Sequence, residues 1–577
     1  MRSPLPRTIL TRLETGRLVL YSLLAGGLVG LVGTGWREVL DMVLTLGAWV
    51  LGYRPPGAAG EGGLLMAFGD TLPYALLLLP ICGALYALLM RSRLSDPLNA
   101  VVAGYHARGD WKDPLTQARG LVGTVLGQAS GLLVGRDSSF IALGSMCALL
   151  LSRVARIDAG ERRVLTLACV AAAIGLVLHA PLAAAVLMAE VLYRRFEFEF
   201  EVLMPCVLAA VCASAVSGLM VGFEPLFSLP GDLTPSAGQL PLYLLLAGAV
   251  TLLSWILAQV TTVISQVFER PAFQRGWLAR WPLRVLLGAV FGLITAAIAV
   301  YSTPTILGGG SGWLQLGVSG FLGSEAGGMA AWRWLLMALG AQLAFGGGVV
   351  VSAATGGLLG VGLASALGGF GLNLDASVSA LIGAATCLTV TLNIPVAAAL
   401  LAVTWGGDAL LPVALASTGL AHTLSGEASL LSGQVSRRAQ SRVHAPTAGT
   451  VLGRIASPLR PLTTVSLPAS ALAAGTLAAE AGDGDSAARL LLTGTASAQS
   501  AAPQARQLYR QEVPRSWLGA RVGVLTLPER MELVGVVQNG QARLSQAGLR
   551  LNAGDELLLL ATPSEFQNWQ QSLRVPG

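Results

Sequence analysis

The chain has few charged residues for its length. Of its 577 residues 12% are charged and 54% are hydrophobic, whereas a typical soluble domain has about 25% charged residues. Apolar runs near the span length of about 20 residues recur, and they are continuous rather than alternating. This composition excludes an ordinary soluble protein and disfavours a β-barrel. It predicts an all-α protein that crosses a membrane many times.

Cysteine and histidine are also scarce, with six and four residues. The cysteines lie in apolar segments without paired spacing, which is typical of small buried side chains rather than disulfides or metal ligands. The sequence has neither a Gly-rich phosphate loop with a lysine nor a nucleophile–base pair. We therefore expect no enzymatic activity, metal or cofactor. The net charge of +6 is better explained by basic cytoplasmic loops than by nucleic-acid binding.

One short polar stretch, Gly135–Ser139 (GRDSS), interrupts the apolar runs just before a helix-compatible segment. Glycine allows the backbone to break, and the next helix begins with free N–H groups that favour negative charge. Polar groups at membrane depth usually line a pathway or pair inside the protein. Asp137 is thus predicted to gate an anion site. The alternative is a helix cap paired with Arg136.

The chain contains an internal repeat. His179–Leu187 (HAPLAAAVL) matches Asn393–Leu401 (NIPVAAALL) at an offset of about 214 residues. Adding the same offset to the break at Gly135–Ser139 gives positions close to Gly346–Ser352. Several segments of about 12 to 16 residues are too short to cross a hydrocarbon core of about 30 Å. We interpret the pattern as two duplicated halves whose broken helices meet near the membrane midplane.

Composition divides the chain into three regions. Residues 1–432 form the expected transmembrane domain, with four arginines before a first span at Leu18–Leu46, so the N-terminus is predicted to be cytoplasmic. Residues 433–511, rich in Ala, Ser, Thr and Pro, are interpreted as a cytoplasmic linker. Residues 512–577 regain strand patterning and predict a small α+β cytoplasmic domain.

These motifs together resemble the CLC family of chloride channels and proton-coupled anion exchangers, in particular its ClcB-like bacterial branch. Gly135–Ser139 stands where the family has Gly-Arg-Glu-Gly-Pro. His179–Ala183 and Met188–Leu192 match its Ala-Pro-Leu-Ala helix and Ala-Glu-Val-Leu continuation, and Gly347–Ser352 matches its Gly-x-Phe-x-Pro region. The similarity covers about residues 15–432. It implies inverted halves, a homodimer with one pore per subunit in a bacterial inner membrane, and both termini in the cytoplasm.

The resemblance places Asp137 on the family's gating glutamate, one methylene shorter. The N–H groups of Val349 and Val350 fall where the second-half helix start holds the central anion. Ser95, in Ser95-Asp96-Pro97, is the nearest candidate for the anion-coordinating serine, and Leu431 stands at the approximate place of the pore tyrosine. The resemblance also implies that the residues on either side of Asp137 line the pore, namely Gly135, Arg136, Ser138 and Ser139.

The inner proton station of the family's exchangers falls on Val191, which cannot hold a proton. Glu190, one residue earlier, would face about 100° away on a helix, so we interpret it as a packing or cap-bonding carboxylate. The leading hypothesis is therefore a chloride-type channel or transporter gated by Asp137 without proton coupling. The alternative is a proton/chloride antiporter with an unidentified inner proton route.

The C-terminal domain resembles the RCK C-terminal (TrkA-C) regulatory domain. Its signals are Leu527-Pro528, the turn at Asn539-Gly540, and Gly554-Asp555 ahead of Glu556–Leu560. This resemblance implies a small-molecule ligand such as a nucleotide. It also raises a cation transport protein as a third hypothesis, which is disfavoured because the spans lack a Thr-Val-Gly-Tyr-Gly filter.

Overall fold

A computed structural model describes residues 7–61, 75–90, 96–107, 114–155, 157, 159–269, 281–343, 345, 347–441 and 443–444 of the helical region. In the C-terminal region it describes 507–514, 517, 519–520, 522, 527, 531–538, 541–544, 549–552, 555–561, 565–566 and 569. The chain divides into two compact units, Met1–Val443 and His444–Gly577.

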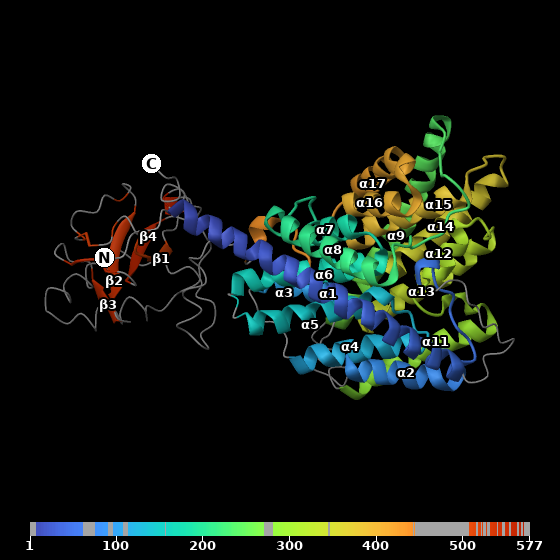
Figure 1. Cartoon of the computed structure of the whole chain (residues 1–577), viewed down its shortest axis with the longest axis horizontal. Helices are drawn as coiled ribbons and strands as arrows, with labels where there is room; N and C mark the ends of the chain where they lie inside the picture. Colours follow the sequence, from blue (N-terminus) through green and yellow to red (C-terminus); the bar gives the residue numbers. More distant parts are fainter. Residues whose placement is uncertain are drawn as a thin grey trace. The chain divides into compact units, whose positions relative to one another are not determined.

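The first unit is helical (Figure 1). The helices of its first half are α1 Arg7–Leu51, α2 Ala75–Leu89, α3 Pro97–His106, α4 Pro114–Ala129, α5 Arg136–Val154, α6 Ala159–Leu178, α7 Pro181–Glu190 and α8 Phe200–Val221. Those of its second half are α9 Leu240–Glu269, α11 Trp281–Tyr301, α12 Ser311–Val318, α13 Glu325–Gly340, α14 Val349–Gly368, α15 Ala376–Leu392, α16 Pro395–Gly406 and α17 Leu411–Ser425.

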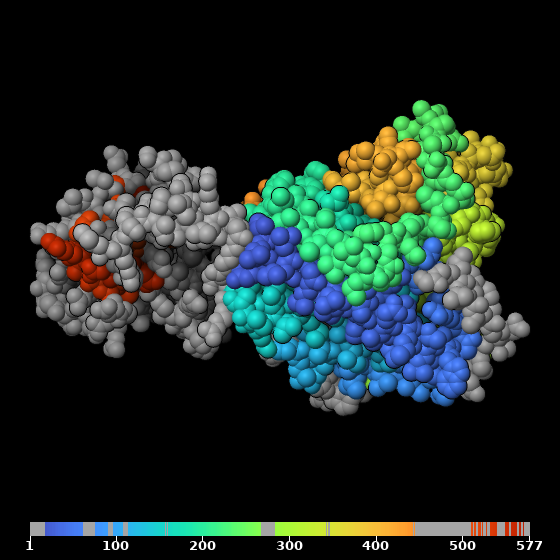
Figure 2. All heavy atoms as spheres, in the orientation of Figure 1, coloured from blue at the N-terminus to red at the C-terminus, as the bar shows by residue number. Residues whose placement is uncertain are grey.

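Six of the described helices are long and apolar enough to cross a membrane. The span expected at Leu18–Leu46 lies within α1, which crosses the outside of α6 and α8 (Figure 1). Figure 2 shows α1, in dark blue, exposed along one face. Large apolar side chains point outward from it, including Met42 and Trp49 at 70% and 82% exposure. The prediction of an all-α polytopic membrane domain is confirmed.

The repeat is visible in the backbone. His179 and Asn393 both adopt left-handed conformations, with φ of 50° and 58°, and each is followed two residues later by the proline that begins α7 or α16. Left-handed conformations are uncommon for residues other than glycine. Their recurrence at one offset, ahead of two helices that contact each other, therefore marks a duplicated turn and not merely shared alanine content.

The segment after α17 belongs to the first unit. Gln434 is buried, and its Nε2 donates to the carbonyls of Val191 at 2.7 Å and Leu392 at 2.8 Å. It thereby satisfies backbone groups at the ends of α7 and α15, which helices otherwise leave without partners. The helical unit thus continues past residue 432, where the sequence analysis places its end.

The second unit contains a four-stranded antiparallel sheet in the order β1-β4-β2-β3. The strands are β1 Gln507–Glu512, β2 Glu532–Gln538, β3 Gln541–Leu544 and β4 Glu556–Ala561. β1 pairs with β4, so the sheet begins before residue 512, the expected domain start. Gln538 pairs with Gln541. Asn539 and Gly540, where a turn is predicted, lie outside the described residues, as do Pro528 and Gly554.

Candidate anion site

The Asp137 carboxylate lies where the first turn of α5 meets the first turn of α14. The side chain is fully buried, and its Oδ2 accepts a hydrogen bond from the Val349 N–H at 2.5 Å. The N–H of Val350 also stabilises the carboxylate. Since the first N–H groups of a helix have no partner within it, an anion held there completes the start of α14. The Asp137 side chain therefore caps a helix that begins 212 residues later in the chain.

Two glycines allow this approach. Gly348 has a φ of +96°, and a Cβ atom added to it would lie 2.5 Å from Asp137 Oδ2. A Cβ atom on Gly135, the N-cap of α5, would lie 2.1 Å from Asp137 Oδ1. Neither position can carry a larger residue without displacing the carboxylate. Asp137 Oδ1 is buried and has no hydrogen-bond partner among the described residues.

Arg136 does not pair with Asp137. Its guanidinium donates to Asp41 of α1 at 2.7 Å and lies 3.8 Å from the Glu61 carboxylate. Consecutive residues on a helix point about 100° apart, so the two side chains diverge. The interpretation of Asp137 as a cap neutralised by Arg136 is wrong for this reason.

The two serines of the polar stretch, Ser138 and Ser139, have different hydrogen-bond partners. Ser138 Oγ donates to Asp96 Oδ1 at 3.4 Å. Ser139 Oγ donates to the Arg136 carbonyl at 2.9 Å, within its own helix turn. Ser95 lies outside the described residues, whereas the adjacent Asp96 caps α3 and faces the site. Sequence reasoning passed over Asp96, although the Asp-Pro dipeptide is a helix-start signal.

Leu431 and Val191 are both buried, at 3% and 0% exposure. The Leu431 carbonyl accepts from Arg194 at 3.0 Å, and Val191 is the C-cap of α7. Glu190 accepts from the N–H groups of Val396 at 3.0 Å and Ala397 at 2.8 Å. It therefore binds the start of α16, consistent with the cap-bonding interpretation.

The loop after α17 is tied to the loop after α7 by an exposed ion pair. Arg195 donates to Glu427, and Ser436 Oγ donates to the same carboxylate at 2.9 Å. The hydrogen bond from Arg195 lowers the pKa of Glu427 below its ordinary value. Ion pairs this exposed contribute little to stability.

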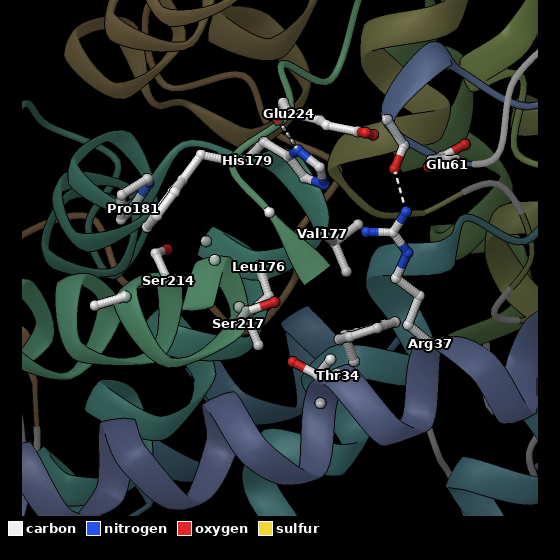
Figure 3. Close-up of a pocket in the computed structure, with 18 of the residues that line it drawn as sticks. Thr34, Arg37, Glu61, Leu176, Val177, His179, Pro181, Ser214, Ser217 and Glu224 are labelled. Atoms are coloured by element: carbon white, nitrogen blue, oxygen red, sulfur yellow. Dashed lines mark hydrogen bonds between the residues drawn. The ribbon is translucent and has the colours of Figure 1, made fainter. Parts of the chain in front are cut away.

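A small cavity of about 60 Å³ reaches the site from the side of α1 and α12, and Val350 and Gly309 line it. A larger cavity of about 470 Å³ lies between α1, α6 and α8 (Figure 3). There Arg37 donates to the Gly60 carbonyl and His179 donates to the Glu224 carbonyl. Arg136 and Glu61 line both cavities. Asp137 lines neither cavity.

Arg333 of α13 is a buried cation that sequence reasoning missed. It is 0% exposed and donates only to carbonyls among the described residues, those of Thr305, Ile306, Gly308 and Gly309 at 2.6–3.5 Å. A Cβ atom on Gly309 would lie 3.1 Å from the Gly135 Cα. The arginine thus supports the loop that packs on the start of α5. An arginine inside an apolar run was the available signal.

The fold and site define a helical membrane protein of two repeated halves, with the buried Asp137 carboxylate at the start of α14. The model of the voltage-gated chloride channel family matches residues 81–426. The chain belongs to this family, the CLC channels and transporters, whose members are not enzymes.

Known relatives agree with this assignment. The chloride/fluoride channel protein of Pseudomonas syringae pv. tomato is 26% identical over 386 residues, which are 65% of this chain and 81% of that protein. A putative ClcB-like chloride channel protein of Ralstonia nicotianae is 27% identical over 54% of this chain and 68% of its own length. The crystal structure of a CLC-type fluoride/proton antiporter matches with a TM-score of 0.60 at 21% identity, covering 74% of this chain and 99% of that one. The last similarity shows the shared fold.

Proposed function

We propose that this protein is an anion channel of the chloride type in which the Asp137 carboxylate is the gate. The observation that carries the proposal is the buried hydrogen bond from the Val349 N–H to Asp137. A helix N-terminus favours any anion that reaches it. The carboxylate therefore holds a place that a permeating anion can take when the side chain is protonated and leaves.

We propose further that transport is not coupled to protons. Val191 stands where a proton station would be needed and is a buried hydrocarbon. Glu190 beside it is held by two N–H groups of α16, which suits a fixed cap better than a side chain that exchanges protons. The alternative is a proton/anion antiporter, favoured by the fold shared with a protein described as a fluoride/proton antiporter.

The remaining proposals concern the setting of this function. We place the chain in the ClcB-like branch, in a bacterial inner membrane, as a homodimer with both termini in the cytoplasm. The exposed apolar side chains of α8, such as Met204 and Leu219, supply a face for lipid or for a second copy. The permeating ion is chloride or a similar anion. The C-terminal unit is proposed as an RCK-like regulatory domain for a small ligand such as a nucleotide.

The test is ion flux from sealed lipid vesicles that contain the full chain. Wild-type protein should release chloride in preference to potassium, and faster at lower pH because protonation frees Asp137. A hydrogen bond to a charged group is worth about 1.5–3 kcal/mol, so Asp137→Ala should raise flux by roughly tenfold or more. It should also weaken the pH dependence. Asp375→Ala, which removes the exposed cap of α15, is the matched control.

Two results would contradict the proposal. Potassium selectivity would exclude an anion pathway. Uphill proton movement driven by a chloride gradient, at a fixed ratio to chloride and abolished by Asp137→Ala, would establish the antiporter instead.

A further inference from the structure

A second buried carboxylate, Asp96, lies beside the start of α14. It is 9% exposed and is the N-cap of α3, where its Oδ2 accepts from the Leu98 N–H at 3.2 Å. A Cβ atom on Gly347 would lie 2.8 Å from the Asp96 Cγ. Asp96 therefore packs directly against the backbone that leads into α14.

Asp96 and Asp137 contact adjacent residues of the same backbone. Asp137 packs on Gly348, and Asp96 packs on Gly347. Ser138, the residue after Asp137, donates to Asp96 Oδ1 at 3.4 Å. Three helix starts, those of α3, α5 and α14, thus bring two carboxylates to one junction.

No basic side chain forms an ion pair with either carboxylate within the described part of the chain. The titratable groups that act on Asp96 from the neighbouring elements are Asp137 of α5 and the Tyr86 hydroxyl of α2. A charged Asp137 opposes a negative charge on Asp96, whereas the Tyr86 hydroxyl is uncharged near neutral pH and does not. Two buried like charges disfavour each other strongly, so the Asp96–Asp137 pair is poised to take up protons.

An ordinary capping role does not account for this placement. An aspartate N-cap needs only its own helix start, as Asp375 shows by accepting from the Val378 N–H at 3.0 Å from an exposed position. Asp96 adds contacts with Ser138 and Gly347. Asp137 Oδ1 is buried and has no hydrogen-bond partner in the part of the chain that the structure describes, which is a second sign that the junction accommodates an exchangeable anionic group.

We propose that Asp96 is a second carboxylate gate in series with Asp137, and that an anion passes the junction only when both side chains are protonated. The proposal rests on the proposed function of Asp137. A channel opened by two protons loses flux about hundredfold per pH unit above its midpoint, whereas a channel opened by one proton loses about tenfold. The number of titrating gates can therefore be determined from the steepness of the pH dependence of flux.

The experiment measures chloride efflux from vesicles of phosphatidylethanolamine and phosphatidylglycerol over a pH series, with equal pH on both sides. We expect the wild-type decline to be about hundredfold per pH unit, and that of Asp96→Asn and of Asp137→Asn to be about tenfold each. The double variant should be nearly independent of pH. Asp375→Asn is the control for a capping aspartate and should keep the wild-type steepness.

A wild-type decline of about tenfold, or an unchanged steepness in Asp96→Asn, would overturn the proposal. If Asp96→Asn does not fold, Asp96→Ser keeps a capping oxygen without the charge and is judged by the same criterion. Failure of the Asp137 gate is distinguishable, because Asp137→Asn would then leave the steepness unchanged while Asp96→Asn still changed it. Chloride flux that is absent from wild type would refute both proposals.

Discussion

Replacing Arg333 by methionine tests whether a buried charge near the start of α5 draws anions to the proposed site. The guanidinium donates to four carbonyls of the loop that ends at Gly309, and Gly309 packs on Gly135 beside Asp137. At an effective dielectric constant of about 20, a unit charge about 10 Å away contributes about 1.7 kcal/mol, or a roughly fifteenfold change in anion occupancy. Arg333→Met should therefore lower chloride flux by roughly tenfold.

Stability should change much less than flux. Four carbonyls lose a partner at about 1 kcal/mol each, while removing an unpaired buried cation regains several kcal/mol of desolvation free energy. The two effects nearly cancel, so the thermal midpoint in detergent should stay close to that of wild type. Arg333→Lys keeps the charge but not the planar fork, and it should retain more flux than the methionine variant.

The assay is chloride efflux from vesicles, with thermal unfolding measured on the same preparations. Arg284→Met, at an exposed position of α11, is the matched control and should leave flux unchanged. Wild-type flux in a folded Arg333→Met protein would refute the electrostatic reasoning. Equal loss in the lysine and methionine variants would instead assign the effect to the loop contacts.

Glu190 and the C-terminal unit, which lie outside the proposed gate, each give a further prediction. Glu190→Gln removes the charge that binds the Val396 and Ala397 N–H groups, so it should lower the free energy of unfolding by about 1–3 kcal/mol, seen as a lower thermal midpoint. The pH dependence of flux should not change in this variant. A changed pH dependence would indicate that Glu190 relays protons. The control is Glu38→Gln, at an exposed site of α1. A chain ending at Val443 keeps the first unit intact, so it should still conduct chloride while any response of flux to added nucleotide disappears. Persistence of that response in the shortened chain would contradict a regulatory C-terminal unit.

The sequence by itself determined the class of fold. Lipid offers no hydrogen bonds to the backbone, so long apolar runs must be helices. Two further features are local and can be recognised from glycine, proline and small residues. They are the polar break at Gly135–Ser139 and the repeated turns at His179 and Asn393. Asp137 could be predicted as a candidate site residue for a similar reason, since a carboxylate in an apolar run is costly unless it has a partner or a function.

Only the tertiary structure decided which groups meet. Asp137 binds an N–H group 212 residues away, Arg136 turns to Asp41, and Asp96 approaches the start of α14. Arg333 stands out in the sequence only as an arginine in an apolar run, and its four carbonyl partners are known only from the tertiary structure. Composition and spacing fix which way a chain folds locally, whereas side-chain partners depend on helix packing across the whole unit, which local spacing does not encode.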